Sequence, residues 1–356
     1  LYYHIDWVLI GAVLAICALG LAMIYSATGG GSRVYWTQVY ALGLGLGAML
    51  ICLAVDYRSL ADKSHWIYLA MMLMLAGVLF FGAVRGGSRR WIDLGSFNLQ
   101  PSEFAKAVLA LMLAKMLGEE RRPALTNNDL FIATSLTAVP FLLIMRQPDL
   151  GTAATLLPIL LVVAYVAGMP MKYVYIGALV AVLAAPIGYR FALQDYQRER
   201  ISTFLDPEQD PRGAGYQQIQ ARITVGSGGM WGKGFMEGTQ GQLRFLPVSH
   251  NDFIFSVLAE EQGLVGVLVA LGLYLFVIMR ALEAARLAKD RLGAYLVLGV
   301  LSSFTFQVIY NITMSAGLAP VKGLTLPLMS YGGSSMIATL AGFGLILNVR
   351  MRRFTN

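Results

Sequence analysis

Two charged residues open an otherwise apolar stretch of the chain, residues 103–117. Glu103 and Lys106 are three residues apart, so they share one face if the stretch is helical. An unpaired charge at the centre of a membrane helix costs roughly 2.5 to 3.5 kcal/mol on insertion scales, and such charges often mark functional sites. The alternative is a structural ion pair near the membrane interface, at an ordinary helix start after Pro101 and Ser102. The residues alone leave both interpretations open.

Three arginines, Arg85, Arg89 and Arg90, fall shortly before this stretch. The planar guanidinium group donates two parallel hydrogen bonds, and this geometry suits phosphate. Arginine beside a membrane span also commonly contacts lipid head groups. The three arginines therefore predict either a phosphate-binding site or an ordinary contact with lipid.

Two aspartates stand at the ends of apolar stretches. Asp149 follows Arg146 in a very short turn, where acid and base can simply pair. Asp252 ends a long loop, directly before the apolar stretch Phe253–Arg280. Residues 249–252 (Ser-His-Asn-Asp) fit a capping box ahead of an apolar run. Spacing alone therefore favours a structural role for Asp252, as a helix cap.

The elements that carry these residues are predicted to cross a membrane. Of the 356 residues, 57% are hydrophobic and only 13% are charged, and the mean hydropathy is +0.64. A soluble domain is usually about a quarter charged, and a helix needs roughly 20 apolar residues to span a bilayer, whereas spanning strands would show alternation. The sequence thus predicts an all-α integral membrane protein, a single domain over residues 1–356. About ten transmembrane helices are expected, at Asp6–Ser26, Trp36–Val55, His65–Ala83, Glu103–Leu117, Leu130–Met145, Thr152–Gly168, Tyr173–Phe191, Phe253–Arg280, Gly293–Ser315 and Ser334–Arg350.

The distribution of basic residues predicts the orientation. Lysine and arginine collect in one set of short loops, which includes Arg58, Lys63, Arg350 and Arg352. Cytoplasmic loops carry such an excess. With ten spans, both termini are expected in the cytoplasm and residues 192–251, between helices 7 and 8, outside.

This large extracytoplasmic loop, residues 192–251, is far longer than the other connections. Loops of such length are usually either functional or disordered. Aromatic and apolar residues run through it, with a glycine-rich stretch at Gly226–Gly234, which argues against disorder. We therefore expect the loop to pack against the outer face of the helix bundle.

Cysteine and histidine give no sign of a metal site. Cys17 and Cys52 both lie inside apolar stretches and are predicted to be small core residues. His4, His65 and His250 are scattered, so no His/Cys cluster has the spacing of a zinc site.

Longer motifs are spread over the whole chain. The loop and the eighth span contain Gly226-Ser-Gly-Gly, Gly232-Lys-Gly, Gly238-Thr-Gln-Gly-Gln-Leu-Arg-Phe-Leu-Pro, His250-Asn-Asp-Phe-Ile-Phe and Ala259-Glu-Glu. Elsewhere stand Trp91-Ile-Asp-Leu-Gly, Gln100-Pro-Ser-Glu-Phe-Ala-Lys, Gln147-Pro-Asp-Leu-Gly-Thr and Pro327-Leu-Met-Ser-Tyr-Gly-Gly-Ser-Ser. Together, and in this order, they resemble the SEDS family, named for shape, elongation, division and sporulation. The motifs at Gly238 and Ala259 look more like the elongation branch, RodA, than the division branch, FtsW.

The resemblance implies a peptidoglycan glycosyltransferase at the outer face of the bacterial cytoplasmic membrane. Such an enzyme joins lipid II units into glycan strands by an inverting β-1,4 transfer and supports cell elongation and rod shape. Asp252 matches the family's catalytic aspartate, so the resemblance makes it the general base for the acceptor hydroxyl. The expected substrate-binding residues are Arg85, Arg89, Arg90, Lys106 and Lys233 for the leaving pyrophosphate, Glu103 to orient Lys106, and Asp149 and Ser330.

The resemblance also implies partners and leaves one cofactor open. Besides lipid II and membrane lipid, we expect a class B penicillin-binding protein, a transpeptidase, and no nucleic acid. A divalent cation, Mg²⁺ or Mn²⁺, stays open, although the paired-aspartate motif of metal-dependent sugar-nucleotide transferases is not found in the sequence. Two other functions also stay open: a flippase for the lipid-linked precursor, which would use charges near the bilayer midplane and broken helices, and a noncatalytic membrane scaffold.

Overall fold

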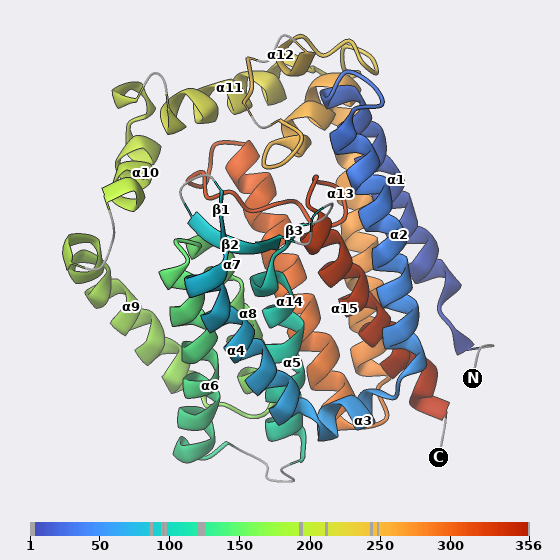
Figure 1. The fold of residues 1–356 in the computed structure, drawn as a ribbon, viewed down its shortest axis with the longest axis vertical. Coiled ribbons are helices and arrows are strands. Elements are labelled where there is room, and N and C mark those ends of the chain that lie inside the picture. Colours follow the sequence, from blue (N-terminus) through green and yellow to red (C-terminus); the bar gives the residue numbers. More distant parts are fainter. Residues whose placement is uncertain are drawn as a thin grey trace.

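The computed structural model describes residues 4–85, 88–93, 95, 98–119, 125–191, 195–210, 213–242, 245–247 and 249–354. In these residues, seven helices are long and apolar enough to cross a membrane, namely α1 (Trp7–Ala27), α2 (Arg33–Ala54), α4 (Ser64–Phe81), α6 (Asn127–Arg146), α13 (Ile254–Arg286), α14 (Arg291–Ser315) and α15 (Gly333–Met351). The other three predicted spans correspond to α5 (Pro101–Glu119), to α7 (Leu150–Ala154) with α8 (Leu156–Val166), and to α9 (Met171–Phe191). The predicted fold, an all-α multi-pass membrane protein, is confirmed (Figure 1).

The inner helices pack closely because small residues face one another. In α15, an added Cβ at Gly344 would lie 2.5 Å from the carbonyl oxygen of Met49 in α2. Without a side chain at this position, the two backbones can come together, as is usual between membrane helices. Helix α14 packs in turn against α5, α8 and α13. Helices α14 and α15 thus form the buried centre, on which the outer spans are arranged (Figure 1).

A small antiparallel sheet, not predicted from the sequence, fills the connection between α4 and α5. Its strands are β1 (Ala83–Arg85), β2 (Ser88–Asp93) and β3 (Asn98–Leu99), in the order β1-β2-β3. The sheet leads directly into α5 and contacts the start of α15 through β3. Arg90 is therefore held on a strand over the bundle, not in an open loop (Figure 1).

The long connection before α13 packs on the bundle, as predicted. It contains the helices α10 (Asp195–Leu205), α11 (Ala214–Ser227) and α12 (Thr239–Gln242), together with a short 3-10 turn, Pro207–Gln209. Helix α11 lies against α13 and α14, over the end of the bundle that carries the sheet (Figure 1). Its contacts tie the long loop to the helices that carry the predicted catalytic residue.

Helix α13 is broken at Gly263, whose φ of 62° lies in the left-handed region that glycine tolerates. A break leaves backbone groups without helical partners, and the glycine-rich loop supplies them. Lys233 N donates to Glu260 O at 3.0 Å, and Leu264 N donates to Gly229 O at 2.9 Å. The loop and the first part of α13 therefore form one hydrogen-bonded unit outside the main span.

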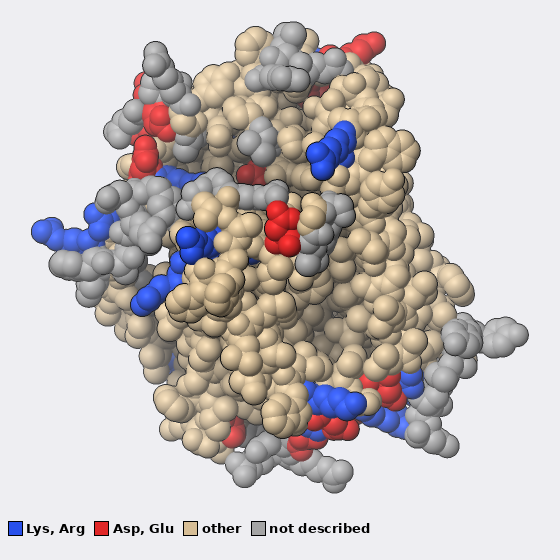
Figure 2. All heavy atoms as spheres, viewed as in Figure 1, with Lys and Arg blue, Asp and Glu red and all other residues tan. Residues whose placement is uncertain are grey.

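Charged side chains gather at the ends of the bundle. On the face drawn in Figure 2, a broad band of uncharged side chains separates the charges at the bottom from those in the upper half. The bottom end carries both chain ends (Figure 1), and there Asp6 pairs with Arg280 at 2.9 Å and with Arg350 at 2.7 Å. These ion pairs join α1, α13 and α15.

Candidate active site

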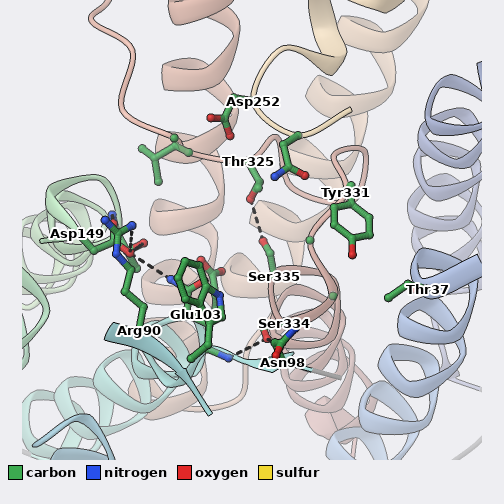
Figure 3. Close-up of a pocket in the computed structure, with 18 of the residues that line it drawn as sticks. Thr37, Arg90, Asn98, Glu103, Asp149, Asp252, Thr325, Tyr331, Ser334 and Ser335 are labelled. Atoms are coloured by element: carbon green, nitrogen blue, oxygen red, sulfur yellow. Dashed lines mark hydrogen bonds and ion pairs between the residues drawn. The ribbon is translucent and has the colours of Figure 1, made fainter. Parts of the chain in front are cut away.

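A polar cavity of about 590 Å³ opens where the sheet, α7, the turn before α13 and the start of α15 meet (Figure 3). Four of the residues predicted to form the site line it together: Arg90, Glu103, Asp149 and Asp252. They come from β2, α5, the start of α7 and the end of the long loop. The other lining residues are Arg33, Val34, Thr37, Trp91, Gly95, Asn98, Gln100, Thr152, Asn251, Gly323, Leu324, Thr325, Tyr331, Gly332, Gly333, Ser334 and Ser335.

Asp252 lies at the upper edge of this cavity (Figure 3) and is not a helix cap. The N-cap of α13 is Phe253, and no side chain caps the helix, so the capping-box interpretation is wrong. In α14, the Asn311 amide donates to the Asp252 carbonyl at 2.9 Å and so fixes the turn. The carboxylate itself has no hydrogen bond or ion pair with the described residues, which leaves it able to accept a proton from a substrate.

Burial raises the pKa of Asp252 and so makes its carboxylate a stronger base. Loss of solvent raises the pKa of Asp252 to about 6, the positive charge of Arg200 opposes the rise, and the negative charge of Asp149 adds to it. A base whose pKa lies nearer neutrality accepts a proton more readily and is still mostly ionised at pH 7. The environment thus makes Asp252 a better general base than an exposed aspartate.

Arg90 and Asp149 form a second polar group, on the left of the cavity in Figure 3. Arg90 donates to the carbonyls of Gln147 at 2.9 Å and Pro148 at 2.5 Å, and its Nη1 lies 3.6 Å from Asp149 Oδ2. Asp149 also caps α7 by accepting from Thr152 N at 3.0 Å. The predicted pairing across the turn with Arg146 is therefore wrong, and Asp149 pairs with Arg90 instead. Arg90 keeps a rigid position with part of its guanidinium facing the cavity.

Glu103 and Lys106 form the ion pair that their spacing allows. Lys106 Nζ lies 2.7 Å from Glu103 Oε2 and 3.0 Å from Gln307 Oε1, and all three side chains are buried. Glu103 lines the main cavity, whereas Lys106 lines a small second cavity of about 30 Å³ behind it. Glu103 therefore stands between the cavity and the ammonium, consistent with its predicted position beside Lys106.

Arg89, Lys233 and Ser330 are not among the described residues that line the cavity. Arg89 is exposed and donates to the carbonyl of Phe80, and Arg85 is on β1, with its side chain outside the described part of the structure. Lys233 pairs with the buried Glu260 at 2.6 Å. Ser330 accepts from Leu326 N at 2.8 Å and so shapes the turn before α15.

Sequence reasoning missed the neutral lining of the cavity. Ser334 donates to the Asn98 carbonyl and accepts from Gln100 N, both at 2.9 Å, and Ser335 lies 3.2 Å from Thr325 (Figure 3). Serine, threonine and asparagine side chains of this kind can contact sugar hydroxyls. The motif that contains Ser330 also contains Ser334 and Ser335, and it is these two serines that line the cavity among the described residues.

A protein-bound divalent cation does not fit the described residues. No group of three or more His, Cys, Asp or Glu side chains among them is placed to hold a metal ion. Glu103 and Asp149 already face Lys106 and Arg90. The Mg²⁺ or Mn²⁺ that the sequence leaves open stays a prediction.

The fold and the cavity together define a polytopic membrane protein with a partly buried carboxylate at the edge of a polar chamber. Residues 5–354 match the FtsW/RodA/SpoVE family, described as cell cycle protein. This chain belongs to that family.

Relatives cover nearly the whole chain. It is 38% identical over 350 residues to the peptidoglycan glycosyltransferase MrdB of Escherichia coli (strain K12), covering 98% of this chain and 94% of that protein. It is 30% identical over 424 residues to the peptidoglycan glycosyltransferase RodA of Treponema pallidum (strain Nichols), covering 98% of each.

Solved structures share the fold. A chain of a peptidoglycan synthase complex, in which polymerization and crosslinking are structurally coordinated, is similar with a TM-score of 0.87 at 37% identity, covering 99% of both chains. The rod shape determining protein RodA of Thermus thermophilus is similar with a TM-score of 0.75 at 34% identity, covering 99% of this chain and 98% of that one. The resemblance to the SEDS family, RodA-like branch, is confirmed.

Proposed function

We propose that this protein is a peptidoglycan glycosyltransferase that joins lipid II units into glycan strands, supporting cell elongation and rod shape. The observation that carries the proposal is the carboxylate of Asp252, partly buried beside a polar cavity in a chain similar to named peptidoglycan glycosyltransferases. Asp252 takes the proton of the acceptor hydroxyl while that oxygen forms a bond to the anomeric carbon of the donor. The bond from this carbon to the pyrophosphate breaks, and its electron pair leaves with the phosphate oxygen. One displacement inverts the α-linked donor to a β-1,4 linkage.

Other groups of the cavity support the transfer in separate ways. Arg90, held by the carbonyls of residues 147 and 148, offers positive charge to a phosphate in a site partly shielded from water. The hydroxyls of Ser334 and Ser335 and the Asn98 side chain are suited to sugar. A water-filled entrance is needed for the sugars, whereas the polyprenyl chains remain in the bilayer.

The same proposal includes an orientation and a partner. Both chain ends lie at the end of the bundle opposite the sheet and the cavity (Figure 1). With basic residues such as Arg58 and Arg352 at that end, the positive-inside tendency puts the termini in the cytoplasm and the cavity outside. A class B penicillin-binding protein would crosslink the new strand, in line with the synthase complex to which the chain is similar.

The test is strand formation from purified lipid II by the full-length protein in lipid nanodiscs, with its transpeptidase partner added. We expect Asp252→Asn to lower the rate by about 10² to 10⁴, the usual contribution of a positioned base. Asp62→Asn is the matched control, because the Asp62 side chain is 69% exposed and its ion pair in the described part of the chain is with Lys115. Asp62 ends the short helix α3 (Tyr57–Asp62), at the end of the bundle opposite the cavity (Figure 1). Equal rates for wild type and Asp252→Asn would remove Asp252 as the base. No strands from the wild type would favour the flippase or the scaffold.

A further inference from the structure

Glu103 and Lys106 face two different cavities. Glu103 lines both the main cavity and the small cavity of about 30 Å³ behind it, whereas Lys106 is a described lining residue of the small one alone. The Lys106 ammonium lies 2.7 Å from Glu103 Oε2. A phosphate in the main cavity would therefore meet the negative charge of Glu103 before it could reach Lys106. This geometry favours a role for Lys106 toward Glu103 over a direct contact with pyrophosphate.

Gln307, on α14, holds the same ammonium from the other side. Its Oε1 accepts from Lys106 Nζ at 3.0 Å, and the side chain is buried within a membrane-spanning helix. An ammonium group only donates, so the amide must present its oxygen to Lys106. The Nε2 of Gln307 is then left without a hydrogen-bond partner among the described residues. A buried polar side chain of this kind is costly inside a membrane and commonly marks a functional site.

The two contacts of Lys106 orient the carboxylate of Glu103. Glu103 Oε2 accepts from the ammonium, whereas Glu103 Oε1 has no hydrogen bond with the described residues. Since Glu103 lines the main cavity (Figure 3), this second oxygen is available to a hydrogen-bond donor there. A functional side chain needs such supporting contacts to stay in one position. Gln307 supplies one of them, because it keeps the ammonium from turning away from Glu103.

The same face of α14 holds the other carboxylate of the cavity. Asn311 follows Gln307 by four residues, so the two buried amides lie one turn apart on one side of the helix. The Asn311 amide donates to the Asp252 carbonyl at 2.9 Å. One helix therefore positions Asp252 directly and Glu103 through the ammonium, which fixes the two carboxylates relative to each other.

We propose that Gln307 is a positioning residue: it fixes Lys106 on Glu103, so that Glu103 Oε1 accepts a hydrogen bond from the disaccharide of the substrate. Sugar hydroxyls are suitable donors, and a charged acceptor makes the bond stronger than a neutral one. Lys106 then orients Glu103, the reverse of the order that the sequence predicts. This inference rests on the proposed function, in which lipid II brings the disaccharide into the cavity.

The test measures binding without turnover, in the full-length protein in nanodiscs. The probe is a lipid II analogue in which hydrogen replaces the acceptor hydroxyl, so that it cannot be joined into strands. Undecaprenyl pyrophosphate, which lacks the sugars, is the reference lipid. We expect Glu103→Gln, which turns the acceptor oxygen into an N–H donor, and Gln307→Met, which removes the amide, each to weaken binding of the analogue about tenfold. Neither should change binding of undecaprenyl pyrophosphate.

Two further variants control for packing. Ser303→Ala is the matched control, because Ser303 lies one turn before Gln307, lines the same small cavity and donates to the Val300 carbonyl of its own helix at 3.0 Å. It should bind both lipids like wild type. Gln307→Asn keeps the amide but draws its oxygen back by one methylene, so it should show the same selective loss as Gln307→Met. It also serves if Gln307→Met does not fold.

A double variant distinguishes positioning from a merely structural role. If Gln307 acts through Glu103, the variant with both Glu103→Gln and Gln307→Met should bind the analogue no more weakly than Glu103→Gln alone. Additive losses would contradict the proposal, as would an equal loss for both lipids in the Gln307 variants. Equal wild-type affinity for the two lipids would remove the sugar contact. None of these measurements needs strand formation, so failure of the inference and failure of the proposed polymerase are separable.

Discussion

Two aspartates at opposite ends of the bundle, Asp6 and Asp252, have opposite surroundings. At the end with the chain termini, Asp6 accepts from Arg280 at 2.9 Å and lies 2.7 Å from Arg350, and Asp290 lies 2.8 Å from Arg58. At the cavity end, the Asp252 carboxylate has no ion pair with the described residues, although the charge of Arg200 acts on it. A paired carboxylate stabilises the fold, whereas an unpaired one remains available to a substrate. The same residue type therefore stabilises the fold at one end and, in the proposed function, serves as the base at the other.

The largest expected effect comes from moving the unpaired carboxylate without removing it. Asp252→Glu keeps the charge but displaces the carboxylate by one methylene, and misplacement of about 1 Å costs about 10²-fold in rate. The rate of strand formation from lipid II checks this. Asp6→Glu is the counterpart at the other end and should leave that rate unchanged. An equal loss of rate in Asp252→Glu and Asp6→Glu would contradict the different roles of the two aspartates.

The next effect is on stability and concerns the paired carboxylate. Asp6→Ala leaves Arg280 and the buried Arg350 without their shared partner, which should lower the free energy of unfolding by roughly 3 kcal/mol. The value lies at the low end of the range for buried pairs because Glu283 remains near Arg350. Denaturant unfolding in micelles measures it, and activity per folded molecule should not change. A loss below about 1 kcal/mol would mean that the pair behaves like an exposed one.

The pH profile tests the unpaired state of Asp252 directly. A base must be ionised to work, so the rate should fall about tenfold per pH unit below the Asp252 pKa of about 6 and level off above it. The charges that face Asp252 set the midpoint. Removing positive charge with Arg200→Gln should move the midpoint up, and removing negative charge with Asp149→Asn should move it down. Opposite shifts would contradict the electrostatic description.

The smallest expected effect is a gain of stability when Asp252 loses its charge. The folded pKa of Asp252 lies above its unfolded value, so the folded state binds the proton more tightly and ionisation costs stability. Stability should therefore fall as pH rises from about 4 to about 6 and stay lower above that. Asp252→Asn does not titrate, so it should unfold at a higher temperature than wild type at pH 7 and at the same temperature at pH 4. A lower unfolding temperature at pH 7 would indicate a structural role.

Much of the fold can be predicted from the sequence, because a bilayer requires long apolar helices and disfavours unpaired charges within them. Apolar length predicts the seven helices that, among the described residues, are long and apolar enough to cross a membrane, and the spacing of Glu103 and Lys106 predicts their ion pair. The family motif singles out Asp252, whereas its spacing alone predicts a helix cap that the structure does not have. Physical pattern alone is therefore sufficient for the fold but not for the proposed base.

The rest depends on contacts between distant segments. Lys233 was assigned to substrate, but the buried Glu260, 27 residues later, pairs with it. Arg200 has no local signal in the sequence, because its charge acts on Asp252, 52 residues later, only once the chain has folded. A single sequence contains no information on which of many basic residues will meet in this way.

Because α13 is broken at Gly263, the position of Asp252 depends strongly on the backbone angle at this glycine. Between Asp252 and Gly263 lie residues 253–262, mostly one short stretch of helix, an arm of about 15 Å at 1.5 Å per residue. A rotation of about 4° at Gly263 displaces the far end of this arm by about 1 Å, which is enough to change the rate about 10²-fold. The backbone hydrogen bonds from Lys233 N to Glu260 O and from Leu264 N to Gly229 O hold the first part of α13 in place. A force on the glycine-rich loop, residues 226–234, would therefore shift Asp252 and change the rate of the proposed transfer.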